Sequence, residues 1–296
     1  MTKFEEMMKS YADSHKQNTA VTAKVYDEKN YFSTNIPKSE READKTIRIL
    51  PQDGNFWTVF HGHKKQLPDG TWKTFPCLKH EEGKDCPFCE AREALLATGK
   101  ESDKKLAKEY SVRKMYILKV IERGNEKDGV KFWRFNHAYD KAGTLDKIMG
   151  AIKIAKHDVT DPETGRDLVV NITRNQFNVP VVLSVNNSLE VSKLSEDANQ
   201  AAIWLSDTRT WRDVYAIKNY DYLEIVVRGH TPVWSKEQEK FVAKEKLESL
   251  GISKDAINEE DDDSELTMGE TEVNNINIPV VDNTQPQEEE DDDLPF

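Results

Sequence analysis

HGHKKQLPDGTWKTFPCLKHEEGKDCPFC, residues 61–89, is the stretch that says most about how this chain folds. It contains all 3 cysteines of the protein, Cys77, Cys86 and Cys89, together with His61, His63 and His80. Cys86 and Cys89 form a C-x-x-C knuckle, which can present two thiolates to one metal ion from a single tight turn. Cys77 and one histidine would complete a tetrahedral Cys₃His set, which is typical of a structural zinc site.

The fourth ligand is open among the three histidines of this stretch. His80 makes a C-x-x-H spacing with Cys77, whereas His61 and His63 precede an LPDG turn that would bring the chain back to Cys77. Side chains alternate along a strand, so His61 and His63 share a face and only one can lie nearest the metal. A redox dithiol is the alternative, but such a motif should lie in a βαβ unit, not in a polar loop with a third cysteine. No H-x-E or H-E-x-x-H motif accompanies the cysteines, so we expect one structural Zn²⁺.

Bulk composition describes a polar, globular chain. Of 296 residues, 37% are hydrophobic and 32% are charged, and no apolar run has the length of a membrane span. The N-terminus lacks the apolar core of a secretory signal. We therefore expect a cytoplasmic protein in a reducing compartment, with no membrane partner.

Charge is distributed unevenly along the chain. Residues 255–296 hold 16 acidic residues and no lysine or arginine, which leaves 38 acidic against 42 basic residues in the remainder. Such a segment cannot bury enough apolar surface to order itself, so we predict a disordered acidic tail. Because it closes on apolar residues, we interpret its tip as a docking peptide for partner proteins, with a solubilising tail as the alternative. The tip comprises Asp291, Asp292, Asp293, Leu294, Pro295 and Phe296.

Residues 1–25 are predicted to form an N-terminal arm. Phe4, Met7, Met8 and Tyr11 follow helical spacing and make one apolar stripe. The stripe could dock on the protein's own core or on a neighbouring molecule.

Basic and aromatic residues alternate in a predicted hairpin of strands 110–121 and 130–135. Rings can stack on bases while cations follow phosphates, which suits single-stranded nucleic acid. The alternative is that the rings pack the sheet, as aromatic residues often do. One face must pack the core, so not every aromatic residue can be a contact. The candidate contacts are Tyr110, Arg113, Lys114, Tyr116, Lys119, Lys131, Trp133 and Arg134.

Short strands dominate the other predicted elements. We expect strands at 46–51, 56–60, 168–174 and 179–185, and helices at 90–98, 140–155 and 235–250. This pattern predicts a mainly β fold with inserted helices (α+β), with an OB-fold barrel core at 26–254 that includes the zinc loop 61–89.

These motifs resemble those of the single-stranded DNA-binding proteins of T-even-type bacteriophages. The resemblance rests on His61-Gly62, Lys64-Lys65, Cys77 and the Cys86-Pro87-Phe88-Cys89 knuckle, and is specific over residues 46–150. It implies an OB-fold, one structural zinc and, in this sequence, His61 as the fourth ligand. The DDDLPF ending is similar instead to the tail tip of bacterial single-stranded DNA-binding proteins.

The resemblance implies a protein that binds single-stranded DNA without strong sequence preference during phage-type replication, recombination and repair. Its tail would recruit replication and recombination proteins, and self-association along DNA is a further expectation. A phage protein of this kind would work in the host cytoplasm. We find no nucleophile elbow, P-loop or dinucleotide fingerprint, so we do not expect an enzyme. The alternatives are a zinc-ribbon adaptor that works through protein contacts and an RNA-binding protein.

Overall fold

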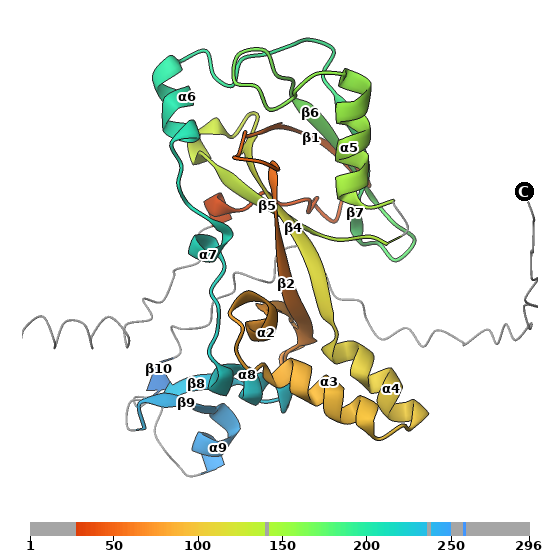
Figure 1. Ribbon diagram of the computed structural model, residues 1–296, viewed down its shortest axis with the longest axis vertical. Coiled ribbons are helices and arrows are strands. Elements are labelled where there is room, and N and C mark those ends of the chain that lie inside the picture. The colour runs from red at the N-terminus through yellow and green to blue at the C-terminus, as the bar shows by residue number, and fades with distance from the viewer. Residues whose placement is uncertain (1–27, 140–141, 236–237, 250–256, 259–296) are drawn as a thin grey trace, which may run out of the picture.

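Two lobes joined by a pair of long strands make up the computed structural model, which describes residues 28–139, 142–235, 238–249 and 257–258 (Figure 1). The joining strands are β2 (Trp57–Gln66) and β4 (Val112–Glu122). The predicted arm at 1–25, the acidic tail and its docking tip at 291–296 lie outside the described residues, apart from Ile257 and Asn258.

A seven-stranded antiparallel sheet is the main element of the fold, in the order β3-β2-β4-β1-β6-β7 with β5 paired to β4. β1 and β2 lie one after the other along the same edge of β4, while β5 takes the opposite edge. The remaining strands are β1 (Glu42–Ile49), β3 (Trp72–Pro76), β5 (Lys131–Asn136), β6 (Leu168–Arg174) and β7 (Pro180–Asn187).

The predicted mixture of strands and helices is confirmed, but a closed OB barrel is not shown. Within the described residues, β3 and β7 end the path of the sheet and do not pair with each other. The fold is therefore an α+β structure dominated by an open antiparallel sheet.

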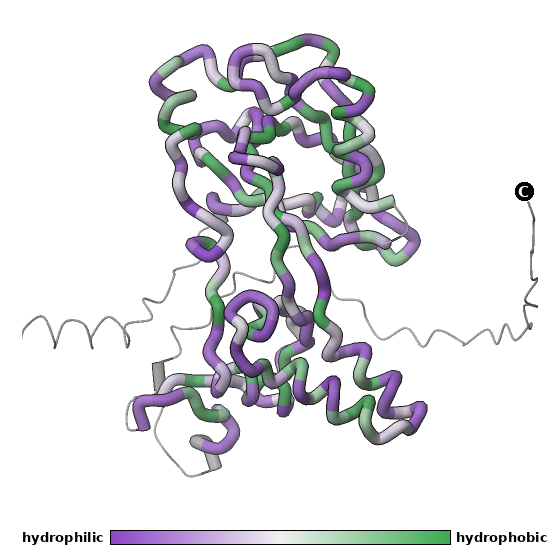
Figure 2. Tube along the Cα trace, viewed as in Figure 1, coloured by the Kyte–Doolittle hydropathy of each residue, from purple (hydrophilic) through white to green (hydrophobic). Residues whose placement is uncertain are grey.

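The sheet lobe, at the top of Figure 1, contains β1, β5, β6 and β7 with two helices, α5 (Thr144–Ala155) and α6 (Ala198–Leu205). Its core forms where alternate strand residues meet the apolar side of α5, through Ile148 and Ala151. Trp133 of β5 lies in this core and is 1% exposed. Figure 2 shows hydrophobic and hydrophilic residues alternating along the chain in both lobes.

The metal lobe, at the bottom of Figure 1, contains short helices around the cysteines and a second, three-stranded sheet. The helices are α2 (Leu78–Glu81), α3 (Pro87–Ala97), α4 (Glu101–Ala107), α8 (Tyr220–Val227) and α9 (Lys244–Ser249). The strands are β8 (Pro232–Ser235), β9 (Lys240–Ala243) and β10 (Ile257–Asn258). The 3-10 turn η2 (Lys108–Tyr110) also lies in this lobe, whereas η1 (Glu28–Asn30) contacts β5 and η3 (Glu126–Asp128) connects β4 to β5.

The predicted helix at 235–250 is wrong over its first half, where β8 and β9 form a hairpin. Trp234 and Phe241 face each other across this hairpin with ring centroids 5.1 Å apart, and cross-strand aromatic pairs of this kind stabilise strands. Among the helices that were not predicted are α6 and α8, although both begin at a recognisable N-cap. Asp197 accepts a hydrogen bond from the Asn199 amide at the start of α6, and Asn219 caps α8.

A connecting segment, residues 206–219, runs from α6 to α8 and includes α7 (Trp211–Val214). Trp211, Val214 and Tyr215 of this segment pack on Phe60 of β2 in a second, aromatic cluster. Arg212 donates to the Glu81 carbonyl and pairs with Glu82, which ties the segment to α2. No helix in the described parts of the chain is long and apolar enough to cross a membrane.

Candidate metal centre and basic cluster

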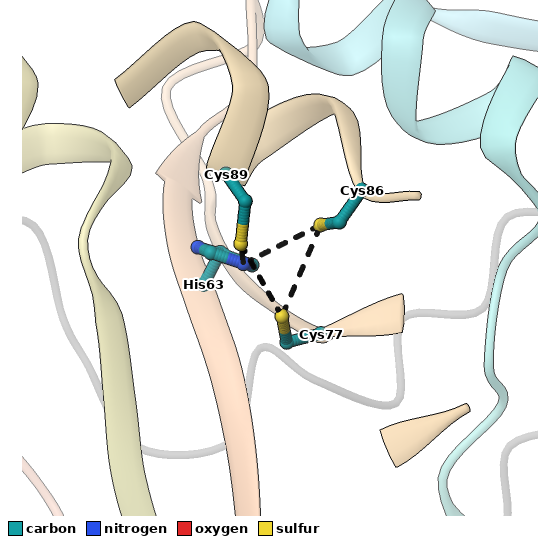
Figure 3. Close-up of side chains that lie close together, drawn as sticks. All are labelled: His63, Cys77, Cys86 and Cys89. Carbon is teal, nitrogen blue, oxygen red and sulfur yellow. Dashed lines mark hydrogen bonds between the residues drawn. The ribbon is translucent and has the colours of Figure 1, made fainter. Parts of the chain in front are cut away.

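His63, Cys77, Cys86 and Cys89 point toward one another in the metal lobe (Figure 3). The Cys77 sulfur lies 3.9 Å from that of Cys86 and 3.6 Å from that of Cys89. His63 Nε2 lies 3.6 Å from the Cys86 sulfur and 3.7 Å from the Cys89 sulfur. Zinc bonds of about 2.3 Å to sulfur and 2.0 Å to nitrogen would place tetrahedral ligand atoms roughly 3.5–3.8 Å apart. The four ligand atoms are therefore spaced to hold one metal ion.

Local structure explains how the four side chains converge. His63 pairs with Phe75 across the β2–β3 hairpin, and Cys77 follows β3 directly. Cys86 is the N-cap of α3 and Cys89 lies in its first turn. The positive end of a helix dipole stabilises thiolates at such positions.

Gly62 is required where β2 pairs with the end of β3. A Cβ at this position would lie 2.9 Å from the Phe75 carbonyl oxygen and 3.0 Å from the Met115 side chain. The absence of a side chain lets the strands approach closely, and this approach sets the position of His63.

Contacts around His63 orient the ring for metal binding. Its Nδ1 lies 3.0 Å from the Tyr110 carbonyl oxygen, an acceptor that requires a proton on Nδ1 and leaves the Nε2 lone pair facing the sulfurs. The ring is fully buried and stacks on Phe88 at 4.8 Å with an interplanar angle of 8°. Burial lowers the pKa of His63, but hydrogen bonds with Cys77 and Cys86 raise it to about 9. In the metal-free site the ring would therefore carry a proton that a metal ion must displace.

His61, the fourth ligand implied by the resemblance, lies outside this group. The expected ligand set is therefore corrected: His63, the alternative, takes the fourth position. The ligand atoms that lie within 4.8 Å of one another belong to His63 and the three cysteines, and the His61 ring is not among them. Glu81 instead accepts a hydrogen bond from the His61 amide at 2.7 Å and lies 3.2 Å from its ring. His80 Nδ1 lies 3.2 Å from the Cys77 sulfur, so this ring contacts a ligand from outside the group.

Half of the candidate nucleic-acid contacts have structural roles in this conformation. Trp133 and Tyr116 pack in the core of the sheet lobe, at 1% and 7% exposure. Lys131 is 5% exposed and lies 2.6 Å from Glu122 Oε2. Lys119 donates to the Asp207 carbonyl of the connecting segment.

Tyr110 and Lys114 are half-buried. The Tyr110 carbonyl holds His63, and its ring lies 4.5 Å from the Lys65 amine. The Lys114 amine lies 5.4 Å from the centroid of the Tyr116 ring.

Arg113 and Arg134 lie on the opposite face of β4 and β5 from Lys114 and Tyr116. Together with Lys64 they form a group that we call the basic cluster. Burial, together with the charges of Arg113 and Arg134, lowers the pKa of Lys64 to about 8. The three cations are therefore close enough to repel one another.

Aromatic rings flank the basic cluster. The Lys64 amine lies 4.8 Å from the centroid of Trp72, and the Arg134 guanidinium lies 5.6 Å from that of Tyr215. Nη1 of Arg134 is buried and has no hydrogen-bond partner among the described residues.

Three members of this surface, Lys64, Trp72 and Tyr215, were not predicted as contacts. Because β2 pairs with β4 and side chains alternate between the two faces of a strand, Lys64 lies on the same face of the sheet as Arg113. Tyr215, by contrast, comes from a distant segment and has no sequence signal.

No protein-family model and no curated protein matches this chain. Its functional assignment therefore depends on the geometry of the metal centre and of the basic cluster.

Proposed function

We propose that the protein binds single-stranded DNA without strong sequence preference, through the basic cluster and the rings beside it. The observation that carries this proposal is that strand pairing places Lys64, Arg113 and Arg134 on one face of β2, β4 and β5, where Lys64 and Arg134 are half-buried. Like charges in such a place destabilise the unbound protein, and a bound anion relieves the repulsion. Phosphate is suited to this role because arginine presents several donors to its oxygens.

The neighbouring rings favour a single strand over other anions. Trp72 and Tyr215 lie beside cations of the cluster, and unpaired bases stack on such rings while the backbone follows the charges. In duplex DNA the faces of the bases are stacked on one another and are not available to these rings.

The metal in this proposal is one structural Zn²⁺ held by His63, Cys77, Cys86 and Cys89. Three thiolates and one imidazole form a closed tetrahedral set that leaves no position for a substrate, so zinc would supply folding energy. His63 and Lys64 are neighbours on β2 and point to opposite faces, so the metal would fix the strand that carries the cluster.

The same proposal extends to the biological role of the protein. The open sheet would be an OB-type variant, and the protein would act in phage-type replication, recombination and repair. The acidic tail would recruit replication and recombination proteins through residues 291–296. Because the tail is strongly acidic, it would also compete with DNA for the basic cluster.

The test is a fluorescence titration of the full-length protein with oligo(dT) at two salt concentrations. The 6 tryptophans provide the signal. We expect tight binding that weakens with salt, and weak binding to a duplex of equal length. Arg113→Ala and Arg134→Ala should each lower the slope of log K against log salt by about 0.7 for each phosphate that the arginine neutralises.

Arg228→Ala is the matched control, because Arg228 lies at the end of α8 and pairs with Glu224. It should bind as the unmodified protein does. Absence of salt-dependent binding in a zinc-loaded sample would refute the proposal and favour a zinc-ribbon adaptor. A strong preference for oligo(U) over oligo(dT) would favour an RNA-binding protein.

A further inference from the structure

Tyr139 is an exposed aromatic residue that belongs to none of the hydrophobic clusters among the described residues. It follows β5 by three residues and is 85% exposed. Among the described residues next to it, Asn136 is polar and Ala138 is half-buried, so neither extends it into an apolar patch. An isolated exposed ring of this kind suits a small planar ligand better than a protein surface, which needs several apolar neighbours.

A series of contacts connects the Tyr139 ring to the core of the sheet lobe. Its ring packs edge-on against His137, with centroids 4.5 Å apart and an interplanar angle of 82°. Nδ1 of His137 lies 3.0 Å from the hydroxyl oxygen of Tyr116, which is buried in the core. The His137 amide donates to the Lys114 carbonyl at 2.9 Å. Tyr139 is therefore positioned by the core while most of its own surface faces solvent.

A cation lies beside this aromatic series. The Lys114 amine is 5.4 Å from the Tyr116 ring centroid, on the face of the sheet opposite Arg113 and Arg134. His137, whose ring contacts Tyr139, is hydrogen-bonded through its amide to the Lys114 carbonyl, so Lys114 and Tyr139 flank the same residue. A ring and a cation placed in this way can bind a base and its adjoining phosphate. Phe177 is 51% exposed in the turn between β6 and β7, and among the described residues no aromatic ring packs against it as His137 packs against Tyr139.

The two sets of residues are connected through β5. Arg134 belongs to the basic cluster, and Tyr139 lies five positions farther along the chain, past the end of the strand. The strand β5 pairs with β4 on one edge, and its other edge carries a single bridge among the described residues, between Tyr31 and Phe132 at the opposite end of the strand. A flexible polymer could therefore pass from the basic cluster to Tyr139 around the end of β5.

We propose that Tyr139 is a second base-stacking site, which binds a nucleobase after the single strand has left the basic cluster and turned around the end of β5. This second site rests on the proposed function and adds to it a path for the strand and a minimum length of ligand. The phosphate next to the stacked base contacts Lys114. Short oligonucleotides occupy the basic cluster alone, and longer ones reach both.

The experiment measures the affinity of the full-length protein for an oligo(dT) series of increasing length. Tyr139→Ala should bind the shortest oligonucleotides normally, and its affinity should fall roughly five- to a hundredfold above a threshold length. Tyr139→Phe keeps the ring and should bind every length as the unmodified protein does. Arg113→Ala should weaken binding at all lengths, and Phe177→Ala at none.

A spectroscopic readout separates stacking from a structural effect. In Tyr139→Trp, the added fluorescence should be quenched only by oligonucleotides above the same threshold. Normal affinity of Tyr139→Ala at every length, or an equal reduction at every length, overturns the second site but leaves the basic cluster in place. Failure of the unmodified protein to bind any oligonucleotide overturns the proposed function and the second site together.

Discussion

Replacing each of the two histidines of β2 by alanine, one at a time, tests the metal centre most directly. His61 and His63 are two residues apart and share a face of the strand, yet it is His63 whose Nε2 lies near two sulfurs, at 3.6 and 3.7 Å. His63→Ala should remove one of four metal ligands. His61→Ala should remove only the ring contact with Glu81, a residue that also pairs with Arg212. The two variants therefore delete the same side chain with different expected results.

The magnitudes follow from what each ring does. A structural zinc contributes ~10–16 kcal/mol of apparent binding free energy, so an equal share for one ligand of four is roughly 2.5–4 kcal/mol. That share corresponds to a metal affinity lower by about two to three orders of magnitude. His63 is also fully buried against Phe88, so its removal leaves a cavity that adds to the destabilisation. The side chain of His61 is 32% exposed and contacts Glu81 and the His80 ring, and a polar contact of this kind near the surface is worth about 0–1 kcal/mol.

The assay combines metal content after dialysis against a competing chelator with urea unfolding of the same samples. We expect one zinc per chain in the unmodified protein and in His61→Ala, and close to none in His63→Ala. His80→Ala is a second control, because His80 contacts the Cys77 sulfur without being a member of the group. Release of metal from His61→Ala with retention in His63→Ala would refute the assigned ligand set.

Four further results are expected. Because the pKa of Lys64 falls from 10.5 to about 8 on folding, the unfolded state binds more protons between these values. The free energy of unfolding should therefore rise with pH across that window. DNA affinity should fall as Lys64 loses its charge above pH 8. In DNA titrations from pH 7 to 9, Lys64→Arg should make the affinity less dependent on pH. Lys131→Met removes the nearer of two cations paired with buried Glu122, at 2.6 Å, and leaves Lys45 at 3.8 Å, so urea unfolding should show a destabilisation of about 1–3 kcal/mol with no change in the salt dependence of DNA binding. Trp133→Ala should cost about 3–5 kcal/mol in the same assay, and Trp133→Phe clearly less. Deleting residues 255–296 removes 16 acidic residues and should tighten oligo(dT) binding at low salt, and an unchanged affinity would show that the tail does not compete.

Strand pairing decided which candidate contacts face solvent. The alternation of basic and aromatic residues at 110–121 and 130–135 predicts a hairpin, and β4 and β5 confirm it. The sequence does not say which edge of β4 receives β2, or that α5 covers the face that carries Trp133. Burial against α5 made Trp133 a core residue, and pairing with β2 placed Lys64 beside Arg113.

The cysteines alone predicted a group of side chains that could hold a metal ion, because a C-x-x-C knuckle and a third cysteine in one polar loop have few other uses. The sequence also determined the strand-rich class of fold and the charge separation between body and tail, since both depend on local composition and periodicity. The tertiary structure alone decided between His61 and His63. His61 and His63 lie on the same face of β2 and have nearly the same neighbours in the sequence. They differ in their long-range contacts, because α3 and the Tyr110 carbonyl lie next to His63, whereas Glu81 contacts His61.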